Sequence, residues 1–189
     1  MVAIAGPPGA GKSTLAAHLC ESVKISGKRC CVVPMDGFHL DNRVLNELGL
    51  LSRKGSPQSF DIPGFIHTIK RIHSLKEDVV VPVFNRDADV AIAGARRVMR
   101  NDSVVLVEGN YLLSAEHPWS DLYDLFDMKI FINPGIDEVE KRILERWDIA
   151  QLDHAEIHQR TYGNDLPNAE YVLSHSNVRD AIPFNSIID

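Results

Sequence analysis

Short runs of consecutive apolar residues alternate with longer segments of helical spacing along most of the chain. Four runs show no alternation with polar residues: 2–5, 30–34, 104–107 and 129–132. Three other segments repeat apolar residues every three or four positions: 12–26, 64–76 and 136–150. Strands without alternation are buried on both faces, as in parallel sheets covered by helices. The pattern therefore predicts a doubly wound α/β fold.

The remaining segments are less regular. Residues 40–63 carry Gly, Pro, Ser and mixed charge, which indicates mostly loop with one short helix. Residues 79–84 have strand character, 88–100 are interpreted as a helix, and 171–173 as the last strand of the core. Without an internal repeat, a low-complexity tract or a linker, residues 1–189 are expected to form a single domain.

Composition narrows the classes of partner. The formal net charge is −6 and the chain lacks a long basic run, so a nucleic-acid surface is not expected. Three cysteines, two of them adjacent, make a poor disulfide framework and favour a reducing compartment. No stretch approaches the roughly 18 apolar residues of a membrane span, and no leader peptide is recognised. We expect a cytoplasmic protein without a membrane partner, and a homodimer stays open.

Residues 6–13 read Gly-Pro-Pro-Gly-Ala-Gly-Lys-Ser, which is G-x-x-x-x-G-K-S without a mismatch. An apolar run precedes this loop and a helical segment follows it, as in phosphate-binding loops. The glycines let the backbone N–H groups of 9–14 face phosphate oxygens, and Lys12 would reach the β and γ oxygens. The Ser13 hydroxyl would bind Mg²⁺. The candidate nucleotide ligands are Gly6, Gly9, Ala10, Gly11, Lys12, Ser13 and Thr14. The motif therefore predicts binding of ATP and Mg²⁺.

Two acidic residues follow apolar strands. Glu108 ends the run 104–107, where an acid is expected on Mg²⁺ or on one of its waters. Asp36 ends the run that begins at residue 30, and it is our candidate general base, because an acceptor hydroxyl needs a carboxylate to take its proton. A solvated strand-end acid and a turn aspartate are the structural alternatives.

The phosphate loop, the stretch Met-Asp-Gly-Phe-His-Leu-Asp at 35–41 and Val-Glu-Gly-Asn-Tyr-Leu-Leu at 107–113 occur in this order. Together they resemble the P-loop kinases grouped with uridine kinase, phosphoribulokinase and bacterial pantothenate kinase. Segments 53–61 and 82–86 also resemble acceptor-site segments of this group. The ending Asn-Asp-Leu-Pro-Asn-Ala at 164–169 is most similar to a bacterial branch called uridine kinase-like or fructokinase-like.

The resemblance implies a fold and a set of roles. The fold is a P-loop NTPase three-layer sandwich with a helical lid, in which strands at 30–35, 104–107, 2–5, 129–132 and 170–173 follow one another across the sheet (order 2-3-1-4-5). The acceptor region would span about 37–97 and the lid about 142–165. The implied catalytic residues are Lys12, Asp36, Glu108, Arg142 and Arg146. The implied acceptor ligands are His39, Asp61 and Arg86.

Two departures concern the acceptor. Gly37-Phe38-His39 stands where uridine kinases usually carry an aromatic hydroxyl, and Asn85 stands where they usually carry Asp. We therefore expect an ATP-dependent kinase acting on an alcohol group of a small metabolite, with a fructose-like sugar as the leading acceptor. A nucleoside and a pantothenate-like alcohol are the alternatives, and a non-catalytic nucleotide-binding protein is the alternative of a different class.

Two pairs of residues have helical spacing. Arg142 and Arg146 lie one turn apart, so they either face the phosphates together or are solvated surface residues. His154 and His158 share this spacing, but without a third ligand they are interpreted as a solvated helix face. A regulatory GTPase is disfavoured because the chain lacks an Asn-Lys-x-Asp segment.

Overall fold

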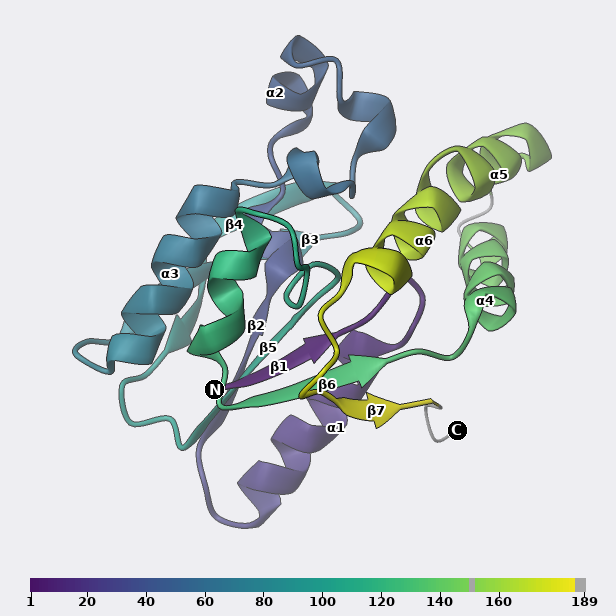
Figure 1. Ribbon diagram of the computed structural model, residues 1–189. Coiled ribbons are helices and arrows are strands. Elements are labelled where there is room, and N and C mark those ends of the chain that lie inside the picture. Colours follow the sequence, from purple (N-terminus) through teal and green to yellow (C-terminus); the bar gives the residue numbers. More distant parts are fainter. Residues whose placement is uncertain (150–151, 186–189) are drawn as a thin grey trace.

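The computed structural model describes residues 1–149 and 152–185, and its centre is a five-stranded sheet (Figure 1). Across the sheet the strands are β2 (Cys30–Pro34), β5 (Val104–Gly109), β1 (Val2–Ala5), β6 (Met128–Ile132) and β7 (Ile182–Phe184). Every neighbouring pair is parallel. The fold is therefore the predicted α/β sandwich.

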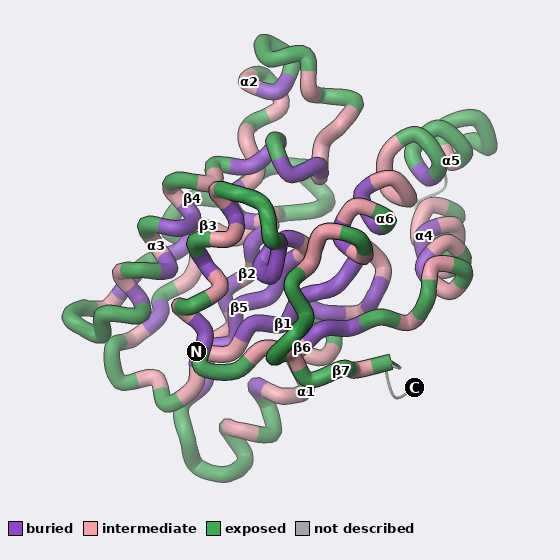
Figure 2. The backbone as a smooth tube through the Cα atoms, in the orientation of Figure 1, coloured by how far each residue is buried: buried purple, intermediate pink, exposed green. Residues whose placement is uncertain are grey.

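Helices cover both faces of this sheet. Helix α1 (Lys12–Ile25) buries Ala16 and Cys20 against Ile4 and Leu106 on one face. Helix α3 (Ile62–Ser74) and the 3-10 helix η4 (Trp119–Leu125) pack on the other face, where buried aromatic and aliphatic side chains form the larger core. Figure 2 shows the buried strands at the centre of the molecule. Each fully buried Ile, Leu or Phe contributes roughly 1.5–3 kcal/mol, so both layers hold the sheet in place.

Strands β3 (Val79–Asn85) and β4 (Val90–Val98) form a separate antiparallel hairpin. The predicted helix at 88–100 is wrong. The Ala-rich composition favours a helix locally, but Val90, Ile92 and Val98 pair with β3 and the strand pairing prevails. The hairpin lies against η1 (Met35–Phe38), so closely that a Cβ on Gly37 would collide with the Pro82 carbonyl oxygen.

Several helices follow β6 in the described part of the chain, the last of them ending at residue 175. Helices α4 (Ile136–Ile149) and α5 (His154–Arg160) precede a π-helical turn, η5 (Thr161–Asp165), and helix α6 (Leu166–His175). The predicted strand at 171–173 is wrong, because Asn168, Ala169 and Val172 are buried at helical spacing. The short strand β7 takes the fifth position in the sheet. Residue 150, the predicted end of α4, lies outside the described residues.

Several short elements connect β2 with α3. They are η1, helix α2 (Asn42–Glu47) and the 3-10 turns η2 (Leu51–Arg53) and η3 (Pro57–Ser59), in agreement with a mostly irregular segment that contains one short helix. Within the described residues, no helix has the length and apolar character that crossing a membrane requires. Because β5 lies between β2 and β1, Glu108 near the end of β5 and Asp36 just after β2 lie with the phosphate loop at the carboxyl ends of the strands.

Candidate active site

The phosphate loop joins β1 to α1 in a conformation that needs its glycines. Gly9 and Gly11 have φ angles of 73° and 87°, which residues with a Cβ rarely adopt. A Cβ on Gly6 would lie 2.5 Å from the Ile132 carbonyl oxygen, so the loop can approach β6 only with glycine there. Ala10 is fully buried. No side chain caps the start of α1, which leaves the first-turn N–H groups, Ser13 and Thr14 included, open to an anion.

Lys12 is folded back over this loop. Its Nζ donates to the Pro7 carbonyl oxygen at 2.8 Å, and 8% of the residue is exposed. Burial lowers the pKa of Lys12 to about 8, while Glu108 and Asp36 act in the opposite direction. The ammonium group is therefore desolvated, and an anion in the loop would interact with it strongly.

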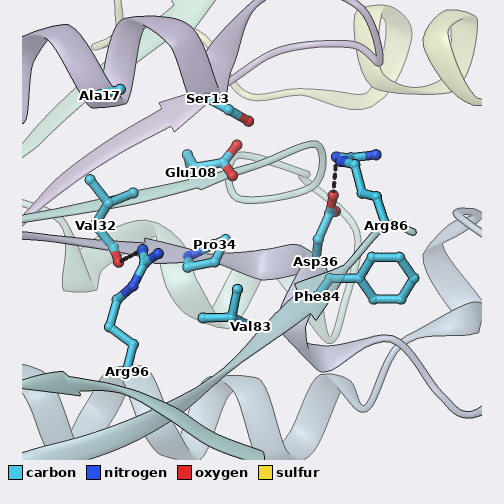
Figure 3. Close-up of a pocket in the computed structure, with 10 residues that line it drawn as sticks. All are labelled: Ser13, Ala17, Val32, Pro34, Asp36, Val83, Phe84, Arg86, Arg96 and Glu108. Atoms are coloured by element: carbon cyan, nitrogen blue, oxygen red, sulfur yellow. Dashed lines mark hydrogen bonds and ion pairs between the residues drawn. The ribbon is translucent and has the colours of Figure 1, made fainter. Parts of the chain in front are cut away.

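Glu108 lies at the end of β5 and is buried, with 7% of the residue exposed. It pairs in register with Pro34 of β2, and its carboxylate faces the first turn of α1 (Figure 3). Burial, and secondly the charge of Asp36, raises the pKa of Glu108, and Lys12 and the Ser13 hydroxyl oppose this shift. Two acids close together in a dry site are costly unless a cation joins them.

Asp36 lies in η1, directly after β2. Its Oδ2 accepts a hydrogen bond of 2.8 Å from Nη2 of Arg86, which lies in the turn of the β3–β4 hairpin. Sequence reasoning proposed Asp36 for the acceptor hydroxyl and Arg86 for the acceptor, and the two side chains are in direct contact.

A cavity of about 300 Å³ lies between α1, β2 and the hairpin (Figure 3). Its polar lining consists of Ser13, Asp36, Arg86, Arg96 and Glu108, and its apolar lining consists of Ala17, Val32, Pro34, Val83 and Phe84. Small-molecule sites commonly combine such apolar walls with a few convergent polar groups. This cavity is therefore the candidate acceptor site.

His39 and Asp61 are not among the described residues that line this cavity. The His39 ring packs at centroid distances of 4.1 Å from Phe60 and 4.9 Å from Phe84, and burial lowers its pKa. Asp61 is the N-cap of α3, and its Oδ1 accepts from the Gly64 N–H at 3.0 Å. Both residues have structural contacts here, and their predicted roles at the acceptor stay untested.

Arg142 and Arg146 lie on α4, which packs against the phosphate loop. A Cβ on Gly9 would lie 3.7 Å from the Arg142 Cβ. Arg142 Nε donates to Glu138 at 2.6 Å, and Arg146 Nη2 donates to Asp165 at 2.7 Å. Among the described residues, Arg142 Nη1 and Arg146 Nε are buried and have no hydrogen-bond partner. Because unpartnered buried donors are costly, both guanidinium groups are suited to receive an anion.

Asp165 fixes the orientation of Arg146. Its Oδ2 also accepts from Trp147 Nε1 at 2.8 Å, and the Arg146 guanidinium carbon lies 4.4 Å from the centroid of the Trp147 ring. Asp165 belongs to the segment 164–169 that the sequence singled out without a role. Its position in η5, which folds back onto α4, could not be seen from the sequence.

The same segment binds the candidate acceptor region. Arg53 donates to the Gly163 carbonyl at 2.6 Å and to Asn168 Oδ1 at 3.2 Å, and Asn164 Nδ2 donates to the Lys54 carbonyl at 2.8 Å. Asn168 is 2% exposed. The end of the proposed lid and the loop at 53–55 therefore form one connected network. Sequence spacing gave no signal for this network.

The residues present fit a magnesium nucleotide. In the described ranges, no group of three or more His, Cys, Asp or Glu side chains could hold a metal alone, and His154 and His158 belong to no such group. Mg²⁺ commonly takes only one or two protein ligands beside phosphate oxygens and waters. The buried Glu108 carboxylate next to the Ser13 hydroxyl is such a partial ligand set.

Residues 1–151 match the phosphoribulokinase / uridine kinase family, and the chain belongs to this family of P-loop kinases. The predicted resemblance is therefore confirmed.

Individual relatives refine this assignment. A pantothenate kinase of Enterococcus faecalis is 32% identical over 165 residues, which are 86% of this chain and 53% of that protein. The chain thus spans about half the length of this relative. A protein of Silicibacter sp. TM1040, named for a fructose transport system kinase, is 40% identical with a TM-score of 0.88, covering 97% of this chain and 88% of that chain. YFH7 of Saccharomyces cerevisiae has a TM-score of 0.84 at 18% identity, covering 99% and 92%.

Proposed function

We propose that the protein transfers the γ-phosphoryl group of ATP to an alcohol group of a small metabolite. The observation that carries this proposal is the convergence of Lys12, Glu108 and Asp36. Lys12 and Glu108 lie at the phosphate loop, whereas Asp36 and Glu108 line the adjoining cavity. A nucleotide-binding protein without catalysis would need Lys12 but would have no use for Asp36 at the mouth of such a cavity.

Each residue has a defined task in this reaction. Asp36 accepts the proton of the acceptor hydroxyl. The oxygen of that hydroxyl forms a bond to the γ-phosphorus, while the bond between the γ-phosphorus and the β–γ bridging oxygen breaks and ADP leaves. Lys12 stabilises negative charge on the phosphate oxygens. Arg146, with Arg142 beside it, faces the charge that develops in transfer. Ser13 and Glu108 would hold Mg²⁺, which would neutralise phosphate charge.

A hydroxyl group of a sugar is the leading acceptor. The 40% identity to the Silicibacter protein, and the name of that protein, support it. A pantothenate-like alcohol is supported by the E. faecalis relative and a nucleoside by the family. Gly37, His39 and Asn85 depart from the uridine kinase pattern, which weighs against a nucleoside, and the test includes both alternatives.

The proposal is tested by incubating the protein with ATP, Mg²⁺ and a panel of sugars, nucleosides and pantothenate, and by measuring ADP and phosphorylated product. We expect one class of acceptor to raise ADP formation at least about 100-fold over hydrolysis to water. ADP formation that no alcohol stimulates would favour a simple nucleotide hydrolase, and ATP binding without any turnover would favour the non-catalytic alternative.

A further inference from the structure

Arg96 lines the candidate acceptor cavity although sequence reasoning gave it no role. It is half-buried, and its Nη1 donates to the Val32 carbonyl oxygen at 2.6 Å. Among the described residues Arg96 forms no ion pair. A guanidinium group has five N–H donors, so a single carbonyl leaves most of them unused.

The β-strand geometry explains why this charge faces inward. Arg96 pairs with the fully buried Val81 and lies two residues before the buried Val98, so it shares their face of the hairpin. Arg97 faces the opposite way, is 61% exposed in its side chain and pairs with Asp78. Two adjacent arginines on one strand therefore differ in environment, and only Arg97 has a carboxylate partner.

Each acid near Arg96 or in the same cavity has another role or partner, and Glu108 is the proposed Mg²⁺ ligand. The charges of Asp102 and Arg96 both affect the pKa of the Cys31 thiol, so the two side chains lie in the same region. Asp102 binds Arg29 and accepts a hydrogen bond from the Met99 N–H at 2.8 Å. Asp36, at the other end of the cavity, is paired with Arg86. A half-buried cation without a counter-ion is costly, so a site that holds one is suited to an anionic ligand.

Arg96 is remote from the candidate reaction centre. Figure 3 shows the Arg86–Asp36 pair at one end of the cavity and Arg96 beside Val32 at the other. Val32 precedes Asp36 by four residues along β2 and η1, a span on the order of 10 Å. Val32, Pro34 and Val83 form apolar walls between the ends, and Ser13 and Glu108 also line the cavity.

From these observations we propose that the acceptor is an anionic alcohol, whose carboxylate or phosphate group binds Arg96 while its hydroxyl lies at Asp36. This inference rests on the proposed kinase function and adds the charge of the substrate. Among the sugars proposed above it favours a sugar acid or a sugar phosphate over a neutral sugar, and a hydroxy acid such as pantothenate would also fit. Arg96 is then a specificity-determining residue.

The experiment compares matched pairs that differ in charge: gluconate with glucose, glycerate with glycerol, pantothenate with pantothenyl alcohol, and fructose 1-phosphate with fructose. Binding is measured by calorimetry with the phosphate loop saturated by Mg²⁺ and a non-hydrolysable ATP analogue, so that anions cannot bind there. The variants are Arg96→Gln, Arg96→Lys and, as the matched control on the same strand, Arg97→Gln. Phosphorylation of each compound is measured in parallel with ATP.

We expect at least one anionic compound to bind roughly 10- to 100-fold more tightly than its neutral partner. Arg96→Gln should remove this preference, Arg96→Lys should restore part of it, and Arg97→Gln should keep it. The carboxylate and phosphate pairs tell which anion is used.

Equal binding of charged and neutral partners, failure of every anion to bind, or an unchanged preference in Arg96→Gln would overturn the inference. Phosphorylation of the neutral partner would then leave the kinase proposal standing. Loss of binding of the ATP analogue itself would instead contradict the kinase proposal, so the two failures are distinguishable.

Discussion

Arg86 and Asp36 form an ion pair of 2.8 Å across 50 residues of chain. Arg86 belongs to the turn of a hairpin that stands apart from the central sheet, and Asp36 follows the edge strand β2 of that sheet. The β3–β4 hairpin, which lines the candidate acceptor cavity, therefore also contacts the proposed base. Because their side chains are 68% and 28% exposed, the pair is accessible to an incoming hydroxyl.

Asp36→Asn tests the proposed base. It keeps the shape of the side chain and removes its ability to take a proton. We expect kcat to fall by about 10²–10⁴-fold with little change in ATP affinity. Steady-state kinetics with an identified acceptor and nucleotide titration check this. A change confined to acceptor KM would show that Asp36 only binds.

Asp61 caps helix α3 through its contact with the Gly64 N–H, and it is also predicted to bind the acceptor. Two substitutions can distinguish these two roles. Asn caps helices about as well as Asp, whereas Ala costs about 1 kcal/mol. If Asp61 also binds the acceptor, Asp61→Asn should raise acceptor KM without changing the melting temperature, and ATP hydrolysis to water should be spared. Asp61→Ala should change both KM and melting temperature. An Asp61→Asn variant with normal KM would leave Asp61 the capping role alone.

Lys12→Ala should lower kcat by about 10²–10³-fold or more, since it removes the cation facing the β and γ oxygens. The fold should persist, because the change removes a desolvated charge rather than an apolar contact. Lys24→Ala, in the last turn of the same helix, is the matched control and should have normal turnover. Circular dichroism and activity measured together check the expectation, and near-normal turnover in Lys12→Ala would reject the phosphate-loop mechanism.

Asp165→Ala should misplace Arg146, whose Nη2 it binds at 2.7 Å. Since a small displacement of a catalytic group can cost up to about 100-fold, we expect kcat to fall by about 10- to 100-fold. Asp165→Asn, which can still accept from Trp147, should fall less. A double-mutant cycle of Arg146→Gln, Asp165→Ala and the combined variant measures how strongly the two residues are coupled in catalysis. Additive losses would show that Asp165 does not act through Arg146.

Nucleotide binding should take up protons near pH 8. Burial lowers the pKa of Lys12 to about 8 in the free protein, and phosphate oxygens favour its charged form, so binding raises this pKa. At pH 8 about half a proton should be taken up, and at pH 6 almost none from this group. Calorimetry in buffers of contrasting ionisation enthalpy measures it. Lys12→Arg, always charged, should show no such uptake.

The central part of the fold could be predicted because its signals are local. The motif at 6–13 and the unbroken apolar run at 104–107 each determine their structure within a few residues. Residues 88–100 could not be predicted in this way. Their Ala-rich stretch has helical propensity. The extended form is selected by pairing with β3, a strand that lies earlier in the chain.

That error also hid part of the candidate site. On a helix, Arg96 and Arg97 would point in directions about 100° apart, whereas on a strand they face opposite sides of the hairpin. The alternation of Val90, Ile92 and Val98 was the signal that could have indicated a strand. Residues 171–173 were mispredicted for a similar reason. The short run Tyr171-Val172-Leu173 was interpreted as a strand, whereas burial at helical spacing over α6 prevailed.

Within the described residues, β3 and β4 pair with each other and not with the central sheet, and contacts such as Arg96 to the Val32 carbonyl join them to it. In the proposed function, donor chemistry therefore resides in the sheet and its loop, while the choice of acceptor resides largely in an appended element. An appended element of this kind can change residue by residue without disturbing the nucleotide site. The scaffold is thus open to new substrates by exchange of one hairpin, which makes residues 79–98 the natural target for redesigning specificity.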